Sequence, residues 1–189
     1  MAMKKIYLAG PDVFLPDPHA AGAAKKHLCQ QYGFDGLFPI DSEISVADDE
    51  SLAFAISREN EALIHQADII IANLTPFRGP SADAGTVYEL GLARGLGKVL
   101  AGYSNVSTPF TERSWQHSGH GAMPEDSEAP LADRDGLTIE NFGLHDNLML
   151  EGGIYLANGI FITCDTPPEQ RYTDLSAFEQ ILKQLAERI

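Results

Sequence analysis

Residues 67–103, ADIIIANLTPFRGPSADAGTVYELGLARGLGKVLAGY, contain two short apolar runs separated by a segment of helical character. The runs at 67–74 and 98–103 have the length and the apolar content of strands that are buried on both faces of a sheet. Between them, Asp83 opens a stretch rich in Ala, Leu and Gly that predicts a helix. A strand, a helix and a strand in this order indicate two parallel strands joined by a crossover helix.

The same alternation continues on both sides of this unit. In the helix expected before it, Leu52, Ile56 and Leu63 share one face at helical spacing, and Glu59 interrupts this apolar stripe. Five strands that alternate with helices predict an α/β fold, a doubly wound, flavodoxin-like or Rossmann-like five-stranded parallel sheet with helices on both faces. A chain of 189 residues is expected to form one domain, 1–189. The other expected strands are 4–10, 34–40 and 159–163, and the other expected helices are 17–31, 48–66, 146–152 and 173–188.

One long stretch interrupts the alternation. Residues 104–144 are rich in Gly, Pro, Ser and His, carry seven acidic and two basic side chains, and show no sustained periodicity. We therefore expect an irregular excursion here that is either functional or partly disordered. The residues leave open whether it covers a pocket or forms a subunit contact.

The charge balance restricts the partners that the protein can have. With 13 basic and 27 acidic residues, the formal net charge is −14, which repels nucleic acid and anionic membranes but not a small neutral substrate. The two cysteines, Cys29 and Cys164, form no disulfide framework and suit a reducing compartment. The start MAMKKIYLAG lacks the pattern of a signal peptide, and no apolar run approaches the roughly 20 residues of a membrane span. These features predict a cytoplasmic protein without nucleic-acid or membrane partners.

The strongest functional signal is an isolated carboxylate. Between Ala84 and Ala93 the only charged side chain is Glu89, and no basic residue lies three or four positions away. A buried, unpaired carboxylate is costly, so it requires a partner, a raised pKa or a cleft. Tyr7, on the first expected strand, is placed to donate a phenolic hydrogen bond from the sheet.

Ligands of such sheets bind beyond the carboxyl ends of the strands, which here are followed by the loops 10–17, 39–47 and 74–84. Two carboxylates near this edge, Asp83 and Glu89, suit the cleavage of an N-glycosidic bond. One carboxylate would stabilise or capture the positive anomeric carbon, and the other would manage the proton on the departing base.

Simpler structural interpretations remain beside the functional ones. Asp83 is equally well placed to cap the helix that it opens, and Tyr7 is a plausible core aromatic. The histidines of HSGH (117–120) have a metal-like spacing, but no acidic or cysteine neighbour completes a site, so a solvated loop is expected. The sequence holds neither a phosphate-binding loop nor a dinucleotide-binding glycine motif. We therefore expect no metal and no organic cofactor.

Four segments resemble the nucleoside 2-deoxyribosyltransferases, in the order that this family shows. The resemblance covers most of the chain apart from 104–144, and the D-x-G-T-x-x-E-L-G element is its most specific part. The four segments are IYLAGPDVF (6–14), ADIIIANL (67–74), ADAGTVYELG (82–91) and DNLM (146–149).

The resemblance implies roles for individual residues. Glu89 is then the nucleophile that attacks C1′ of a 2′-deoxynucleoside, with Asp83 assisting proton transfer or holding the base, and Tyr7 orienting Glu89. Asn147 matches a residue that family members donate across a subunit contact, which implies a homodimer or a higher homo-oligomer with shared sites. Asn60 falls where some members carry an aspartate, so a proton-transfer role is not carried over. By resemblance and by place in the loops, the expected substrate-binding residues are Gly10, Phe14, Asp41, Glu43, Asn60, Asn73, Arg78, Gly79, Asn147 and Met149.

The implied activity is the transfer of 2-deoxyribose between a 2′-deoxynucleoside and a free purine or pyrimidine base, and three alternatives stay open. The first is a nucleoside or nucleotide N-glycosidase of similar fold, in which water takes the sugar; the first loop, GPDVFLPDP, offers no cation for a 5′-phosphate. The second is a phosphoribohydrolase that releases cytokinin bases, although the P-G-G that precedes its motif is absent here. The third is a non-catalytic nucleoside-binding module, which has no need of a buried unpaired acid.

Overall fold

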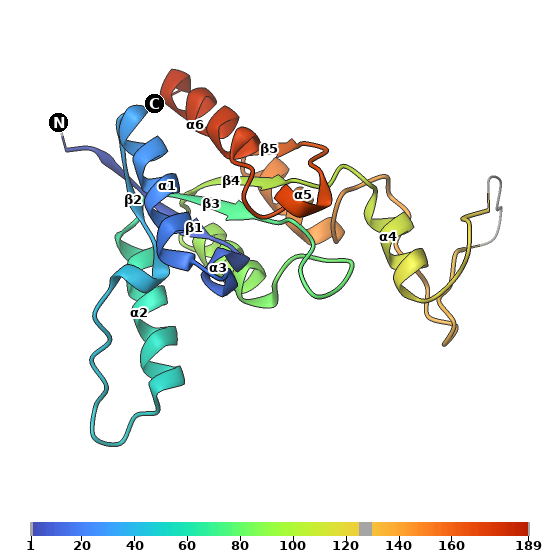
Figure 1. Ribbon diagram of the computed structural model, residues 1–189, viewed down its shortest axis with the longest axis horizontal. Helices are drawn as coiled ribbons and strands as arrows, with labels where there is room; N and C mark the ends of the chain where they lie inside the picture. Colours follow the sequence, from blue (N-terminus) through green and yellow to red (C-terminus); the bar gives the residue numbers. More distant parts are fainter. Residues whose placement is uncertain (1, 125–129, 189) are drawn as a thin grey trace.

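The computed structural model describes residues 2–124 and 130–188 and contains a five-stranded, all-parallel sheet in the order β2-β1-β3-β4-β5 (Figure 1). The order reverses between β1 and β3, so the fold is the doubly wound α/β sheet that the alternation predicts. The strands are β1 (Lys4–Ala9), β2 (Phe34–Leu37), β3 (Ile69–Asn73), β4 (Val99–Ser104) and β5 (Ile160–Thr163). The helices are α1 (Pro18–Gln31), α2 (Leu52–Gln66), α3 (Ala84–Gly95), α4 (Phe110–His117), α5 (Leu148–Leu156) and α6 (Ser176–Arg188).

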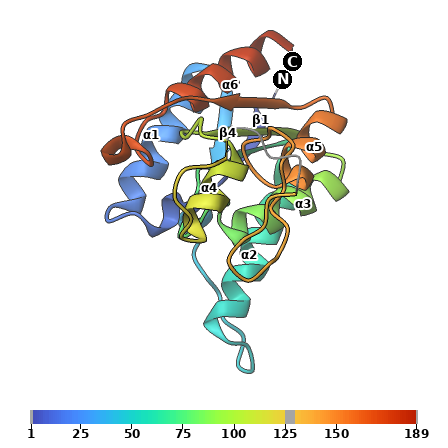
Figure 2. The same cartoon turned by 90° about the vertical axis from the view of Figure 1, so that its right-hand side faces the viewer.

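Two layers of helices enclose the sheet. Helices α1 and α6 cover one face, while α2, α3 and α5 cover the other (Figure 2). Side chains alternate along β3 accordingly, with Ile69 and Ile71 in the first core and Ile70 and Ala72 in the second. Both faces of the strand are therefore apolar, which explains the continuous hydrophobic run in the sequence. None of the helices in the described ranges has the length and apolar character that crossing a membrane requires.

Observed boundaries differ from the expected ones by a few residues. Strand β2 ends at Leu37, because Pro39 lacks an N–H group and begins a short 3-10 helix, Pro39–Asp41. Helix α5 runs four residues beyond the expected end at 152. Helix α6 begins at Ser176, three residues after the expected start at 173.

Two expectations about secondary structure hold only in part. Most of the described residues in 104–144 are irregular, as expected, but the stretch also contains α4, and an isolated bridge joins Ala132 to Thr138. Only the carboxyl-terminal part of the expected apolar stripe of α2 meets the core, because Leu63 packs against it while Leu52 and Ile56 are exposed. Ala55 and Ile64 are the buried residues of this helix. The amino-terminal half of α2 extends away from the sheet, together with the connection that precedes it (Figure 1), so Leu52 and Ile56 have no sheet to cover.

Several loops that follow the strands meet at the carboxyl edge of the sheet, where a buried ion pair holds the first of them. Asp12, in the 3-10 helix Pro11–Phe14, lies 2.7 Å from the ammonium of Lys25 on α1, and both side chains are almost fully buried. The amide of Asn73, at the end of β3, donates to Asp12 over 3.2 Å. A buried charge requires such partners, so the three groups fix the first loop against the neighbouring strand.

Gly10 is required by the same packing. A Cβ atom at this position would lie 2.3 Å from Oδ2 of Asp12 and 2.8 Å from Cβ of Asn73. Both distances are shorter than real contacts, so any side chain here would force the first loop away from β3.

We expect Gly10→Ala to lower the free energy of unfolding by about 1–3 kcal/mol, the usual cost of overpacking a close-packed site. Urea unfolding monitored by circular dichroism measures this change. Gly152→Ala on α5 is the matched control, because nothing lies within 4 Å of its added Cβ and alanine favours a helix. An equal stability change in the two variants would contradict the packing argument.

Candidate active site

The centre of the candidate site is a hydrogen bond between the sheet and α3. The hydroxyl of Tyr7 donates to Oε1 of Glu89 over 2.6 Å, across 82 residues of sequence. The ring of Tyr7 is fully buried on β1, so the phenol is held by the core, and Glu89 lies one turn into α3. The hydrogen bond therefore fixes the carboxylate in one orientation relative to the sheet.

Burial and nearby groups shift the pKa of Glu89. Burial raises the pKa of Glu89, and the nearby Asp83 carboxylate raises it further, whereas the Tyr7 hydrogen bond opposes both, which leaves the pKa at about 7. Burial also raises the pKa of Tyr7 far above its ordinary value, with Glu89 adding to the effect, so the phenol stays protonated and keeps donating. A carboxylate with this pKa changes its charge near neutral pH and is poorly solvated when ionised, as a nucleophile needs to be.

Asp83 does cap α3, as the simpler interpretation holds. Its Oδ2 accepts from the N–H of Thr86 at 3.0 Å and from the Thr86 hydroxyl at 3.2 Å. Both bonds use the same oxygen, and within the described residues no hydrogen bond reaches Oδ1. The capping bonds thus hold the carboxylate near Glu89 and leave one oxygen for a further partner.

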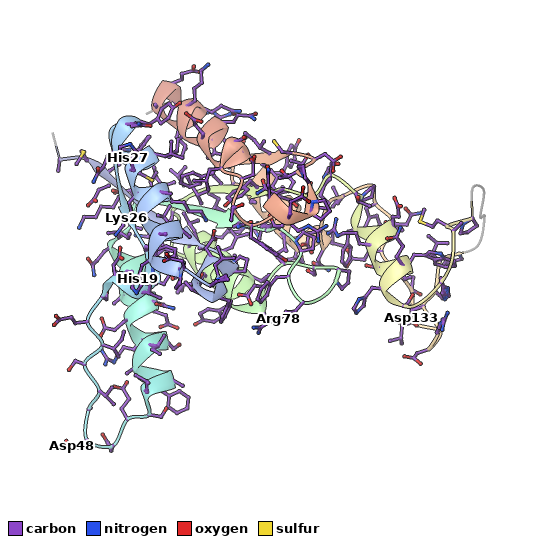
Figure 3. All side chains as sticks on the ribbon, in the orientation of Figure 1. His19, Lys26, His27, Asp48, Arg78 and Asp133 are labelled. Carbon is purple, nitrogen blue, oxygen red and sulfur yellow. The ribbon has the colours of Figure 1, made fainter. Side chains whose placement is uncertain are left out.

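Aromatic rings and a guanidinium gather at the loops that follow β1 and β3. Phe14 and Phe77 stack with their ring centroids 5.4 Å apart, and the Arg78 guanidinium lies 5.0 Å and 4.6 Å from these two rings. Arg78 has a positive φ of 55°, a conformation that non-glycine residues seldom adopt, and it is followed by Gly79. Figure 3 labels Arg78 beside the connection between β3 and α3. Phe14 is 54% exposed, so this group presents a flat apolar surface at the edge of the sheet.

Other expected binding residues have structural partners of their own. Asn73 is buried and its amide serves the Asp12 network, while its Oδ1 accepts from the N–H of Thr75. Asp41 forms an ion pair with Lys26 of α1 at the surface. Glu43 is exposed in the connection before α2. The structure therefore engages Asn73 and Asp41 in holding the fold.

Asn60 on α2 behaves differently. Its Oδ1 is buried and has no hydrogen-bond partner among the described residues. An unpaired buried acceptor costs free energy unless a ligand or a water molecule satisfies it. Asn60 thus retains the hydrogen-bonding capacity that a substrate contact requires.

The expected pair from DNLM lies at the start of α5. Asn147 caps this helix by accepting from the N–H of Met149 at 3.0 Å, and its amide donates to Glu140. Met149 is 63% exposed. Among the described residues, no hydrogen bond joins Asn147 to Glu89 within one chain.

Two residues that sequence reasoning missed hold the loop before α3. Asp146 is buried and accepts from the Ser81 hydroxyl at 2.5 Å and from the N–H of Ala82 at 2.9 Å. Arg113 of α4 donates to three backbone oxygens, those of Pro80, Thr108 and His145. Asp146 was quoted only as part of a motif, and the aperiodic stretch around Arg113 carried no signal for its contacts.

The acidic, histidine and cysteine side chains are dispersed in the described residues. In residues 2–124 and 130–188, no three His, Cys, Asp or Glu side chains gather closely enough to hold an ion. The histidines of HSGH lie at and just beyond the end of α4, where His117 is exposed and the His120 ring lies 4.0 Å from that of Trp115.

The sequence between β1 and the start of α5 matches one protein family. A model of the nucleoside 2-deoxyribosyltransferases matches residues 6–149, which include Tyr7, Asp83, Glu89 and Asn147. The chain belongs to this family.

One solved structure agrees with the assignment to the nucleoside 2-deoxyribosyltransferases, and two further proteins are similar to the chain. The structure is similar to that of a 2-desoxiribosyltransferase from Leishmania mexicana, with 32% identity, a TM-score of 0.64 and coverage of 95% of this chain and 97% of that one. An uncharacterized protein of Schizosaccharomyces pombe is 29% identical over 195 residues, which cover 97% of this chain and 89% of the relative. A conserved protein from Enterococcus faecalis V583 shares the fold, with 22% identity, a TM-score of 0.57 and coverage of 97% and 99%.

The raised pKa of Glu89 predicts a stability that depends on pH. An unfolded glutamate has a pKa of about 4.3, whereas in the folded protein the value is about 7. Between these values the folded state keeps the proton that the unfolded state loses, so the free energy of unfolding falls as the pH rises. We expect Glu89→Gln, which carries no charge, to be more stable relative to the parent protein at pH 8 than at pH 5.

Thermal unfolding at the two pH values measures this difference. Glu187→Gln, on the exposed side of α6, is the control and should change stability equally at both. If Glu89→Gln changed stability relative to the parent protein by the same amount at pH 5 and pH 8, folding would not disfavour the ionised form of Glu89. This result would contradict the raised pKa.

Proposed function

We propose that the protein transfers 2-deoxyribose between nucleobases through a covalent ester on Glu89. The observation that carries the proposal is the half-buried carboxylate fixed by Tyr7 over 2.6 Å in a member of the nucleoside 2-deoxyribosyltransferases. Cleavage of an N-glycosidic bond develops positive charge at C1′, which a carboxylate stabilises and then captures. Among the described residues Glu89 has no ion pair with a cation, so it is available for this carbon.

Two displacements at C1′ complete the reaction. In the first, an oxygen of Glu89 bonds to C1′, the bond from C1′ to the base nitrogen breaks, and the base leaves with that electron pair and takes up a proton. In the second, a nitrogen of an incoming free base attacks C1′, loses its proton, and the bond to Glu89 breaks. Two inversions retain the configuration, and neither step uses a metal or an organic cofactor.

Asp83 and Tyr7 support these steps. The Oδ1 oxygen of Asp83, which the helix cap leaves unbonded among the described residues, is suited to hold the base and to exchange its proton. Tyr7 keeps Glu89 in one orientation and lowers its pKa, so a larger fraction is ionised at neutral pH. The flat surface of Phe14 and Phe77 is suited to stack against a base, and the Oδ1 of Asn60 is suited to accept a hydrogen bond from it.

The experiment that tests the proposal is intact mass measurement with a 2′-deoxynucleoside and no acceptor base. The parent protein should gain one deoxyribosyl group, and adding a second base should release it as a new nucleoside. We expect Glu89→Ala to lose the adduct and to lose turnover by several orders of magnitude, as nucleophile removal does. Glu187→Gln, far from the site on α6, should keep both.

Each other result has a definite meaning. An active Glu89→Ala protein would refute the proposed nucleophile. Release of free deoxyribose at the same rate with and without an acceptor base would make the protein an N-glycosidase. Binding of nucleoside without turnover would make it a nucleoside-binding module.

We further propose that the site is shared between subunits of a homodimer or a higher homo-oligomer, with Asn147 reaching the neighbour's sugar site. Helix α5 exposes Leu148 and Met149 beside Asn147, and its far end exposes Tyr155 at 80% and Leu156 at 71%. An apolar depression of about 460 Å³ lies between α3 and α5, bordered by Leu90, Gly91, Met149 and Gly153. Exposed apolar side chains beside an apolar depression are typical of an interface.

Complementation tests the shared site. Glu89→Ala and Asn147→Ala should each be inactive, and mixing them under conditions of subunit exchange should restore part of the activity. Some mixed interfaces then join an intact Glu89 to an intact Asn147. No recovery after mass spectrometry has demonstrated exchange would place both residues in one subunit.

A further inference from the structure

A second cavity, of about 450 Å³, lies between α4 and the connection from β3 to α3. The loop contributes Gly79 and Pro80, α4 contributes Arg113 and His117, and Arg171 approaches from the connection between β5 and α6. These elements meet beyond the carboxyl ends of β3 and β4, on the side of the molecule where α4 lies (Figure 1). The catalytic proposal for Glu89 uses none of these five residues.

The lining of this cavity is basic in a strongly acidic protein. Two guanidinium groups and one imidazole border it, and none of its lining residues, all of them described, is acidic. Neither Arg113 nor Arg171 has a carboxylate within ion-pair distance among the described residues. Asp146 and Glu151 lie near enough to Arg113 to raise its pKa, but neither borders the cavity. In a chain of net charge −14, two arginines at one cavity whose lining holds no acid indicate a place for an anion.

Among the described residues, Arg113 and Arg171 both have N–H groups that are free to bind such an anion. Arg113 uses Nε, Nη1 and Nη2 once each for backbone oxygens, and a guanidinium has five N–H groups, so two remain. The Nε of Arg171 is buried and has no hydrogen-bond partner among the described residues. A buried N–H without an acceptor is costly, so the site is incomplete without a ligand or a water molecule.

Hydrogen bonds hold the guanidinium of Arg113 and the backbone at Arg171. The side chain of Asn105, which is buried, donates to the backbone oxygens of Arg171 and Asp174, each over 2.9 Å. The bonds of Arg113 tie its guanidinium to three segments of backbone. Burial lowers the pKa of Arg113, and the nearby Arg171 charge lowers it further, whereas Asp146 and Glu151 oppose this effect. An anion between the two cations would relieve their repulsion.

We propose that this cavity, bordered by Arg113, Arg171 and His117, binds a phosphate-class anion, either free phosphate or the phosphate of a phosphomonoester. Two guanidinium groups match the tetrahedral oxygens of phosphate through paired N–H donors, and a dianion balances both charges. The cavity exceeds the size of one phosphate group, so it also admits a small organic substituent. Because Gly79 and Pro80 lead directly into Ser81, Ala82 and Asp83, a bound anion contacts the segment that begins α3.

The probe for the test is inorganic phosphate, titrated into the full chain at constant ionic strength and followed by calorimetry. The parent protein should bind it saturably, and Arg171→Gln should weaken binding about tenfold or more, because a hydrogen bond to a charged group contributes roughly 1.5–3 kcal/mol. Arg171→Lys keeps the positive charge but loses the paired N–H donors of the guanidinium, so its affinity for phosphate should lie between those of the parent protein and Arg171→Gln. Arg188→Gln, at the end of α6 and outside the lining, is the matched control and should bind as the parent protein does.

Two readouts keep the result decisive. Thermal unfolding establishes that Arg171→Gln is folded. Glu89→Ala should bind phosphate as the parent does, which separates this proposal from the proposed nucleophile. The absence of saturable binding in the parent protein, or unchanged binding in folded Arg171→Gln, would overturn the anion site.

A second arm identifies the source of the phosphate. A 2′-deoxynucleoside 5′-monophosphate that competes with inorganic phosphate and depends on Arg171 assigns the cavity to the phosphate of a nucleotide. A monophosphate that leaves phosphate binding unchanged assigns it to a separate free anion. Both outcomes support the site and differ only in which molecule brings the anion.

Discussion

The hydrogen bond from Tyr7 to Glu89 joins the centre of the sheet to the helix that covers it. It forms only if β1 keeps its register between β2 and β3, since a shift of one residue would turn the Tyr7 ring to the opposite face. It also requires that α3 begin close to Asp83, because each residue along a helix turns the side chain by about 100°. The register of the sheet and the start of one helix therefore determine the geometry of the candidate site.

The half-buried carboxylate of Glu89 costs stability when it is ionised, and its neighbours determine how large this cost is. The Asp83 carboxylate opposes ionisation of Glu89, and the Tyr7 phenol favours it, so the two neighbours act in opposite directions on one pKa. On the other face of the sheet, Asp12 has a different environment, because it is paired with Lys25 and bonded to Asn73. A buried carboxylate is thus paired with a cation where it anchors a loop, and is hydrogen-bonded to a phenol where it forms the centre of the candidate site.

Sequence reasoning was most successful where the signal is local. The apolar runs, the capping position of Asp83 and the isolation of Glu89 all lie within short windows, and the five strands and the hydrogen bond to Tyr7 are present in the structure. It was least successful where partners are distant. Asp146 bonds to residues 64 and 65 positions earlier, and no spacing in the sequence indicates this contact. The exposed Leu52 was misplaced for a related reason, since periodicity predicts an apolar face but not whether a sheet lies opposite to it.

Such distant contacts give the irregular stretch 104–144 a structural function. Asp146, just beyond its expected end, accepts hydrogen bonds from Ser81 and Ala82, and Arg113 within it donates to the oxygen of Pro80. These three loop residues immediately precede Asp83, so the excursion and the start of α5 together fix the point at which α3 begins. Because the position of Glu89 on α3 depends on that point, a segment that lacks regular periodicity helps to set the geometry of the candidate nucleophile. The excursion at the carboxyl edge of the sheet is thereby coupled to the candidate site through the side chain of Arg113, and the side chain of Asp146 just beyond it makes the same connection.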